Sequence, residues 1–184
     1  MQARLVLAIA LVFAAGAVAA AQAPDELPDG AVEGTEFDSR LIAARAYAGD
    51  AEVAPGSRLA LVVDVTPKPG MHVYAPGDHL YRVVRLRVDA PDFLETHPLS
   101  YPQSELYHYE PLDETVPVYQ QPFRLVQEVT VPMSEETAAL AAAPDGKLVI
   151  EGVLEYQACD DEVCYIPAEA PLRWELAWRP QSRD

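Results

Sequence analysis

Short apolar segments separated by proline, glycine and aspartate constrain the fold of this chain more than any other feature. The chain has 184 residues, of which 17 are proline. Several segments alternate apolar with polar residues, as in 82–88 and 123–131, which is the period of a half-buried strand. Segments of this length and spacing predict an all-β protein, an antiparallel β-sandwich. The predicted strands lie within residues 39–48, 57–67, 71–76, 81–91, 116–132, 146–159 and 171–178.

A single segment has the pattern of a helix. Residues 134–143 read SEETAALAAA, with Ser134 in position to cap the first turn and Glu135 and Glu136 within it. The sequence therefore predicts one short helix beside the strands.

The first 21 residues have the pattern of a secretory signal peptide. Arg4 precedes an uncharged apolar run over 5–18, and small residues follow it up to a cleavage site near Ala21. An uncleaved anchor is the alternative, but the run is shorter than the roughly 20 residues of a spanning helix. Residues 22–37 are rich in proline, glycine and acid and predict a flexible acidic leader. A single domain is expected over 38–180.

The charge of the chain argues against two classes of partner. Without Arg4, twelve basic residues face 29 acidic residues, a net charge of −17. Nucleic acids and anionic membrane surfaces need a basic face, so neither is an expected partner. Neither the G-x-S-x-G motif of serine hydrolases nor a glycine-rich phosphate-binding loop occurs in the sequence.

Cys159 and Cys164 are the only two cysteines, and four residues separate them. A loop of this size can bring the two sulfur atoms within bonding distance. Export would make both the thiol and the disulfide state accessible, because cytosolic thiols are held reduced. A disulfide that closes so short a loop stabilises a fold by only about 2 kcal/mol. A structural disulfide and a cycling dithiol are both consistent with the pattern.

Metal binding is a third alternative for the cysteine pair. Zinc sites usually have four Cys or His ligands at characteristic spacings, and two cysteines do not supply them. Cu(I) accepts two thiolates, and His108 or Met71 could assist them. The pattern predicts no metal site, and no cofactor is expected.

The loop between the cysteines is acidic. Asp160, Asp161 and Glu162 place negative charge beside both sulfur atoms, which disfavours the thiolate form. Self-activated cysteines have electropositive surroundings instead. We therefore expect the pair to react slowly with stray thiols and to react mainly when a partner supplies the activating groups.

Three segments resemble the family of the N-terminal periplasmic domain of the thiol:disulfide interchange protein DsbD. The specific one is YQACDDEVCYIPAE at 156–169; PKPGMHVYAPG at 67–77 and VPVYQQPFRLVQEVTVP at 116–132 are weaker. The family order of tyrosine, glutamine, small residue, cysteine, loop, cysteine, aromatic residue and proline is matched here. The matching residues are Tyr156, Gln157, Ala158, Cys159, Cys164, Tyr165 and Pro167.

The resemblance implies an immunoglobulin-like sandwich that relays reducing equivalents in the periplasm. A thioredoxin-like donor would reduce the cysteine pair, and disulfide isomerases or cytochrome c maturation thiol proteins would receive the electrons. Cys164 would form the mixed disulfide with a partner, and Cys159 would resolve it. Such a chain is a carrier component of a protein-disulfide reductase system rather than an autonomous enzyme. A non-redox binding module with a structural disulfide is the alternative.

The resemblance also implies an aromatic cap loop over the cysteines. Residues 104–119 occupy the matching region, with Leu106, Tyr107 and Tyr109 as candidates for the cap. Tyr74 matches a family tyrosine beside the cysteines, and His72 falls where the family has an aromatic residue or histidine.

Two differences from the family are visible in the sequence. The best-known members have five residues between the cysteines, and this chain has four. The full family protein also continues into a membrane electron carrier and a thioredoxin-like domain. We therefore expect a separate membrane electron carrier to supply the electrons.

Overall fold

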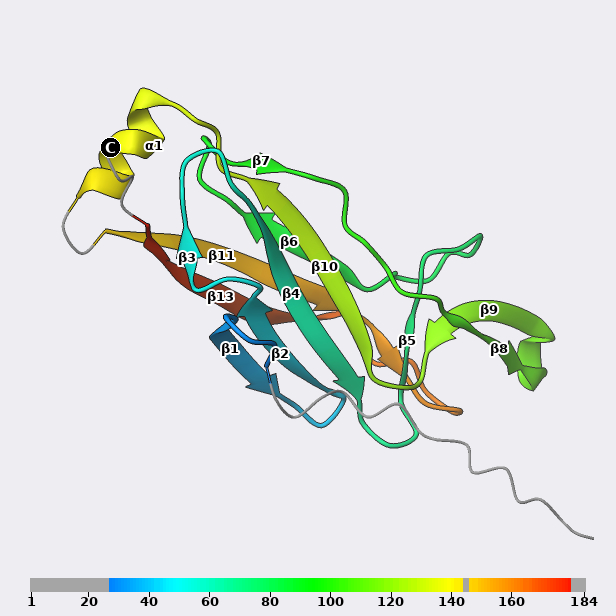
Figure 1. Cartoon of the computed structure of the whole chain (residues 1–184). Coiled ribbons are helices and arrows are strands. Elements are labelled where there is room, and N and C mark those ends of the chain that lie inside the picture. The colour runs from blue at the N-terminus through cyan, green and yellow to red at the C-terminus, as the bar shows by residue number, and fades with distance from the viewer. Residues whose placement is uncertain (1–26, 144–145, 180–184) are drawn as a thin grey trace, which may run out of the picture.

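A computed structural model describes residues 27–143 and 146–179 of the chain. Strands form most of it, with one α-helix and one turn of 3-10 helix (Figure 1). The elements in chain order are β1 (Val32–Asp38), β2 (Ile42–Ala48), β3 (Glu52–Val53), β4 (Arg58–Pro67), β5 (His72–Tyr74), β6 (Arg85–Asp89), β7 (Glu95–Thr96), β8 (Glu105–Tyr109), η1 (Glu110–Leu112), β9 (Glu114–Tyr119), β10 (Phe123–Thr130), α1 (Glu135–Ala142), β11 (Lys147–Tyr156), β12 (Ala158–Cys159) and β13 (Ala168–Trp178).

Two sheets pack face to face. One has the order β1-β2-β4-β10-β7 and the other the order β3-β13-β11-β6. Neighbouring strands are antiparallel, except that β3 and β13 run parallel. The predicted all-β antiparallel sandwich with one short helix is confirmed, and its arrangement is immunoglobulin-like.

The predicted alternation produces the core. Along β10, Phe123, Leu125 and Val129 are buried while the residues between the inward positions lie nearer the surface. Trp174 of β13 is fully buried among side chains of both sheets, and its indole nitrogen donates a hydrogen bond of 3.0 Å to the carbonyl of Tyr47 on β2. Burying a large apolar side chain contributes about 1.5–3 kcal/mol. The alternation along the strands therefore holds the two sheets together, because it places apolar side chains of both sheets in one core.

The helix begins where the sequence predicts. The Ser134 side chain accepts a hydrogen bond of 3.2 Å from the backbone N–H of Thr137, and the Thr137 hydroxyl accepts one of 3.1 Å from the N–H of Ser134. Reciprocal bonds of this kind satisfy two N–H groups that the first turn leaves unpaired.

The structure corrects the predicted leader. Residues 32–37, which the sequence analysis assigned to a flexible segment, belong to β1 and pair with β2. Gly34 lies so close to β13 that an added Cβ would be 2.5 Å from the carbonyl oxygen of Arg173. The predicted signal peptide lies outside the described residues. In the described ranges, no helix is long and apolar enough to cross a membrane.

A third sheet extends beyond the sandwich and carries the cysteines. Its order is β12-β5-β9-β8, and its β8–β9 hairpin projects from the end of the molecule opposite α1 (Figure 1). A small apolar cluster separate from the main core fills the base of this sheet. It consists of Tyr74, Val116, Val118 and Cys159, with Tyr81 and Tyr107 packed against it.

Candidate functional site

The two cysteines face each other across a tight hairpin turn, residues 159–164, called the cysteine turn below. The backbone N–H of Asp160 donates to the carbonyl of Val163, and the N–H of Tyr165 donates to the carbonyl of Ala158, each over 3.0 Å. Cys159 and Cys164 lie between these bonds as an opposed pair, where side chains on neighbouring strands approach closely. They form a disulfide with an S–S distance of 2.06 Å and a Cα–Cα distance of 4.0 Å.

The two sulfur-bearing residues differ in exposure. Cys159 is 1% exposed and belongs to the apolar cluster at the base of the third sheet. Cys164 is exposed on the outer arm of the turn. An incoming thiolate can therefore approach the residue at position 164 from solvent, whereas the protein surrounds the residue at position 159.

Asp160 holds the turn together. Its carboxylate accepts hydrogen bonds from the backbone N–H groups of Glu162 (2.9 Å) and Val163 (2.7 Å) and from the hydroxyl of Tyr165 (3.0 Å). These bonds to the ionised form lower the pKa of Asp160, the two backbone bonds contributing most. The carboxylate thus serves the loop geometry as well as adding negative charge near the sulfur atoms.

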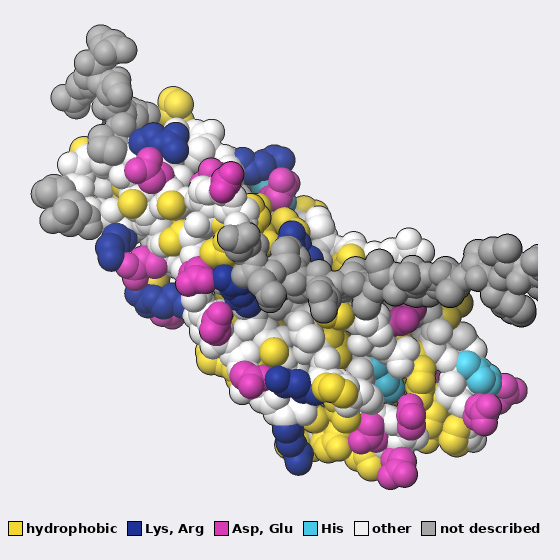
Figure 2. Space-filling model, turned by 60° about the horizontal axis from the view of Figure 1, so that its bottom comes forward, with side chains coloured by type: hydrophobic (Ala, Val, Ile, Leu, Met, Phe, Trp, Pro, Cys, Tyr) yellow, Lys and Arg dark blue, Asp and Glu magenta, His cyan; other side chains and the backbone are white. Residues whose placement is uncertain are grey.

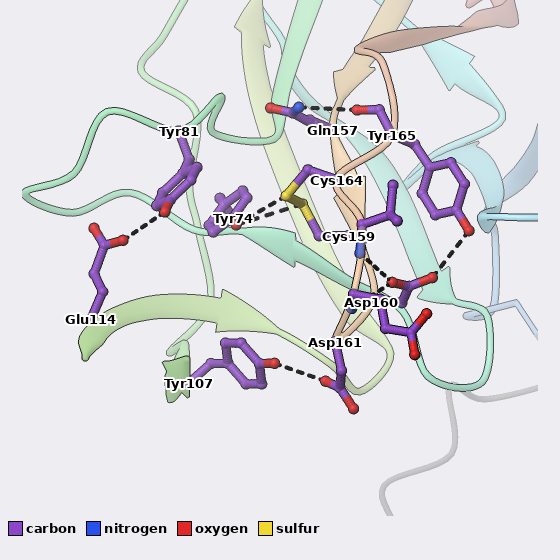
Figure 3. The surroundings of a disulfide bond; sticks show 12 residues. Tyr74, Tyr81, Tyr107, Glu114, Gln157, Cys159, Asp160, Asp161, Cys164 and Tyr165 are labelled. Carbon is purple, nitrogen blue, oxygen red and sulfur yellow. Dashed lines mark hydrogen bonds between the residues drawn. A yellow bond between two sulfur atoms is a disulfide. The ribbon is translucent and has the colours of Figure 1, made fainter. Parts of the chain in front are cut away.

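Tyr165 lies on the opposite side of the turn from Tyr74 (Figure 3). Its ring carries the guanidinium of Arg40 at 5.0 Å from the centroid, and its carbonyl accepts a 3.0 Å hydrogen bond from the Gln157 amide. Tyr165 and Gln157 therefore position the turn. The Tyr165 ring does not line the pocket beside the disulfide.

Tyr74 contacts the disulfide directly. Its hydroxyl oxygen lies 3.5 Å from the Sγ atom of each cysteine (Figure 3). Burial raises the pKa of Tyr74 to about 12, and the neighbouring Tyr81 and Glu114 add to the increase. The phenol is therefore protonated at neutral pH and can donate a hydrogen bond to a sulfur atom.

Tyr81 fixes the Tyr74 ring from the other side. The two rings stack with centroids 4.2 Å apart and an interplanar angle of 5°. The Tyr81 hydroxyl donates a 2.6 Å hydrogen bond to the Glu114 carboxylate at the start of β9. This bond raises the pKa of Tyr81 and ties the 75–84 loop to the β8–β9 hairpin.

The hairpin also contacts the cysteine turn. Tyr107 of β8 donates a 2.7 Å hydrogen bond to the Asp161 carboxylate, which raises the pKa of Tyr107 to about 12. The centroid of the His72 ring lies 4.5 Å from that of the Tyr107 ring. Tyr107 therefore bridges the turn and β5.

His72 is 2% exposed and lies on β5 directly opposite Cys159 on β12. Among the residues that the structure describes, neither ring nitrogen has a hydrogen-bond partner. Burial lowers the pKa of His72, although the nearby Asp161 and Asp160 oppose part of this change. The imidazole is therefore neutral in the disulfide form at neutral pH.

These side chains line an open pocket of about 190 Å³ beside the disulfide. Its lining is aromatic, apolar and acidic, with no lysine or arginine among the described residues that form it. Figure 2 shows apolar and acidic side chains and histidine together on the end of the molecule that carries the third sheet. The lining residues are His72, Tyr74, Tyr81, Tyr107, Tyr109, Leu112, Glu114, Val116, Cys159, Asp160, Glu162, Val163 and Cys164.

The structure brings together most of the residues that the sequence analysis singled out. The implied aromatic cap lines the pocket through Tyr107 and Tyr109, but it leaves Cys164 exposed. Leu106, the third candidate for the cap, is absent from the pocket lining and is 76% exposed. Tyr81 and Glu114 were not predicted, because they lie on segments that meet the cysteines only through the third sheet.

The residues considered for copper binding are not gathered at the site. His108 bonds to Thr115 on the hairpin, and neither it nor Met71 lines the pocket. Within the part of the chain that the structure describes, no group of three or more His, Cys, Asp or Glu side chains could hold a metal ion.

The chain matches one known family in sequence and resembles a solved structure in fold. Residues 39–172 match the family described as thiol:disulfide interchange protein DsbD, N-terminal. The N-terminal periplasmic domain of ScsB from Proteus mirabilis is similar in structure, with 15% identity and a TM-score of 0.52 over 78% of this chain and 50% of that chain. The chain thus spans half the length of that structure. The DsbD N-terminal domain of Neisseria meningitidis in its reduced form has 18% identity and a TM-score of 0.41, over 64% of this chain and 76% of that chain. No curated protein sequence matches the chain.

Proposed function

Because the chain belongs to the family of the N-terminal domain of the thiol:disulfide interchange protein DsbD, we propose that Cys159 and Cys164 are its exchanging pair. Thiol:disulfide interchange is the function of this family, and the chain carries a cysteine pair within the matched residues. The proposal assigns a role to each sulfur atom and to the groups around it.

The difference in exposure between the cysteines carries the proposal. A partner thiolate attacks Sγ of the exposed Cys164, the S–S bond breaks, and its electron pair leaves on Sγ of Cys159. A second thiol of the partner then attacks the partner's own sulfur in the mixed disulfide and releases Cys164. The pair gains two electrons and two protons, and the partner is oxidised to a disulfide. The reduced pair passes these electrons on by the reverse sequence with an oxidised recipient.

Tyr74 supports the chemistry at both sulfur atoms. As a protonated phenol 3.5 Å from each Sγ, it can donate to whichever sulfur carries negative charge as the S–S bond opens. A hydrogen bond to the charged form favours that form. We assign to Tyr74 the stabilisation of the leaving thiolate.

The acidic pocket favours exchange with proteins over exchange with small thiols. Among the described residues, no lysine or arginine lines the pocket, and Asp160 and Glu162 do. Such surroundings keep free thiols protonated. A partner that brings a low-pKa thiolate or positive charge to Cys164 supplies what the pocket lacks.

We assign the partners by family. The donor in this proposal is a thioredoxin-like protein, which a separate membrane electron carrier reduces. The recipients are periplasmic thiol proteins, such as a disulfide isomerase or a cytochrome c maturation factor. Residues 1–21 direct export as a cleaved signal peptide, the domain that begins with β1 at Val32 carries the exchanging pair, and the reaction requires no cofactor.

Trapping distinguishes the two cysteines. The Cys159→Ser variant retains the attacking thiol but cannot resolve a mixed disulfide. The partner is a thioredoxin-like protein whose second cysteine is replaced by serine and whose remaining cysteine carries thionitrobenzoate. Cys164 should displace the thionitrobenzoate, and the covalent complex should accumulate. The Cys164→Ser variant is the matched control, because its remaining thiol is buried, and it should form little complex. Equal trapping by both variants would contradict the assigned roles.

The reduction potential separates a cycling pair from a structural disulfide. Structural disulfides typically have potentials below about −300 mV. Equilibration of the protein with a dithiol buffer should place the Cys159–Cys164 couple above this value. A lower potential, with no reduction by a thioredoxin-like protein, would favour the non-redox binding module.

A further inference from the structure

His72 is a buried polar side chain without a hydrogen-bonding role in the disulfide form. It is 2% exposed, and neither ring nitrogen bonds to any residue of the described ranges. Burying an unpaired polar group destabilises the fold, so such a group calls for an explanation, for example a catalytic or redox role. The ring also lines the pocket beside the disulfide. This position suggests that His72 takes part in the redox reaction.

The register of the third sheet places His72 beside one particular cysteine. β5 and β12 are antiparallel, and His72 lies directly opposite Cys159. Directly opposed side chains leave the same face of a sheet with Cβ atoms about 4.5–5.5 Å apart. In the disulfide form the Cys159 sulfur is bonded to Cys164. Once that bond opens, the Cys159 thiol can rotate toward the imidazole.

We infer that His72 is the proton acceptor for Cys159 when this cysteine resolves a mixed disulfide, an inference that rests on the function proposed above. The Cys159 thiol gives its proton to His72, and its sulfur forms a bond with Sγ of Cys164. The bond between Cys164 and the partner breaks, and its electron pair leaves on the partner's sulfur. The cysteine pair is oxidised by two electrons and the partner disulfide is reduced. In the opposite direction His72 returns the proton to Cys159.

The groups around His72 suit this role. From the turn, the negative charges of Asp161 and Asp160 favour the protonated form of the ring. From β8, Tyr107 covers the ring, and from β5 itself Tyr74 meets it edge-on at 5.5 Å between centroids. The two phenols each have a pKa of about 12 and cannot act as bases at neutral pH.

The carboxylates are less suited to accept the proton. Asp160 already accepts three hydrogen bonds within the turn, and these lower its pKa. Asp161 is exposed and accepts the Tyr107 hydroxyl. The neutral imidazole is the group that is buried, adjacent to Cys159 and able to accept a proton.

The resolving step can be isolated with Ellman's reagent. The reduced protein reacts first at Cys164 and releases one thionitrobenzoate. Cys159 then displaces the second in a first-order phase that does not depend on the reagent concentration. With His72→Gln, this second phase should slow on the order of 10²-fold at about pH 7, as expected for loss of a general base. The difference should shrink as the pH approaches the intrinsic pKa of the Cys159 thiol.

The control is His108→Gln, which removes a histidine from the same end of the molecule but not from the pocket. Its second phase should match that of the wild-type protein. Equal second-phase rates for His72→Gln and wild type would overturn the inference and leave the proposed function intact. The absence of a second phase in the wild-type protein would instead contradict the role of Cys159 in the proposed function.

A measurement without substitution of His72 guards against a folding defect. In the Cys164→Ser protein, NMR titration should show the His72 ring resonances changing at the pH where Cys159 ionises, because the two groups titrate as a coupled pair. In the oxidised wild-type protein this step should be absent. Ring resonances that do not respond to Cys159 would overturn the inference.

Discussion

The hydroxyl of Tyr107 donates a hydrogen bond of 2.7 Å to the carboxylate of Asp161 and so joins the β8–β9 hairpin to the cysteine turn. In the part of the chain that the structure describes, β8 is an edge strand that pairs with β9 alone. The bond to Asp161 therefore holds β8 against the cysteine turn, in addition to the contact between the Tyr107 and His72 rings.

Removing this bond should loosen the hairpin. A hydrogen bond to a charged group contributes about 1.5–3 kcal/mol when it is shielded, and less at an exposed position such as this one. We expect Tyr107→Phe to accelerate amide hydrogen exchange in β8 and to speed reduction by dithiothreitol several-fold. Tyr109→Phe is the control, since Tyr109 lines the same pocket while the bond to Asp161 comes from Tyr107. Unchanged amide exchange in β8 would show that the packing of the Tyr107 ring against His72 holds the strand in place without the hydrogen bond.

Tyr74 should set the redox potential of the pair. Its hydroxyl can donate to a thiolate more strongly than to a disulfide sulfur, so it stabilises the reduced state relative to the oxidised state at a pH where the reduced pair carries a thiolate. Tyr74→Phe should therefore make the potential more negative by ~20–30 mV, the equivalent of one hydrogen bond of about 1 kcal/mol. Equilibration with glutathione at a pH above the thiol pKa of the reduced pair measures this change.

The control for Tyr74→Phe is Tyr81→Phe. That substitution removes the hydroxyl that bonds to Glu114 but keeps the ring stacked on Tyr74. Its potential should stay close to that of the wild-type protein. A shift of the same size in both variants would attribute the effect to the aromatic stack rather than to the Tyr74 hydroxyl.

The stability of the oxidised protein should fall in mild acid because of His72. Burial lowers the pKa of His72 in the folded protein below its ordinary value of 6.5. Below about pH 6.5 the unfolded chain therefore binds a proton that the folded chain does not, and the free energy of unfolding decreases as the pH falls. The contribution of the neutral His72 to the free energy of unfolding is complete above this pH. It is lost progressively as the pH falls to the pKa of His72 in the folded protein.

Urea unfolding between about pH 5 and pH 8 tests this dependence. His72→Phe should flatten the curve in the range just below the ordinary histidine pKa. Parallel curves for the wild-type protein and His72→Phe would mean that the imidazole gains a proton without cost, in conflict with its burial.

The acidic turn should slow reaction with small reagents. Asp161 and Glu162 are exposed beside the cysteines, and their charge raises the pKa of a neighbouring thiol. We expect Asp161→Asn with Glu162→Gln to increase the rate of alkylation of the reduced protein by iodoacetamide at neutral pH several-fold. The increase should diminish in high salt, which screens exposed charges. Glu169→Gln, on β13, is the control, and an equal increase there would indicate a general effect of net charge.

The sequence predicts the sandwich better than the site. Apolar alternation identifies β10 because every second residue along it is buried. Apolar alternation does not identify β1. A register irregularity between Glu33 and Glu36 interrupts its period, and no residue of the strand is fully buried. In the site, Cys159 and Cys164 follow from being the only cysteines of the sequence, whereas Tyr74 and His72 follow from the family resemblance.

Other parts of the site depend on tertiary structure. Tyr81 precedes β6 and Glu114 begins β9, and the two are joined by a hydrogen bond across 33 positions of sequence. No local period indicates such a contact. The exposure of Cys164 likewise depends on where the β8–β9 hairpin lies, which the spacing of residues does not determine.

The fold should persist when the disulfide is reduced, as a carrier with two redox states requires. The bond closes a very short loop, so its loss should lower the free energy of unfolding by only about 2 kcal/mol. Asp160 also holds the turn through its three hydrogen bonds, none of which involves sulfur. Urea unfolding of the reduced protein and of the Cys159→Ser/Cys164→Ser double variant should therefore give similar, slightly lowered midpoints. Asp160→Ala should leave the oxidised turn in place but increase amide exchange at Glu162 and Val163 after reduction. If reduction alone abolishes cooperative unfolding, the disulfide is a structural element and the two-state carrier is excluded.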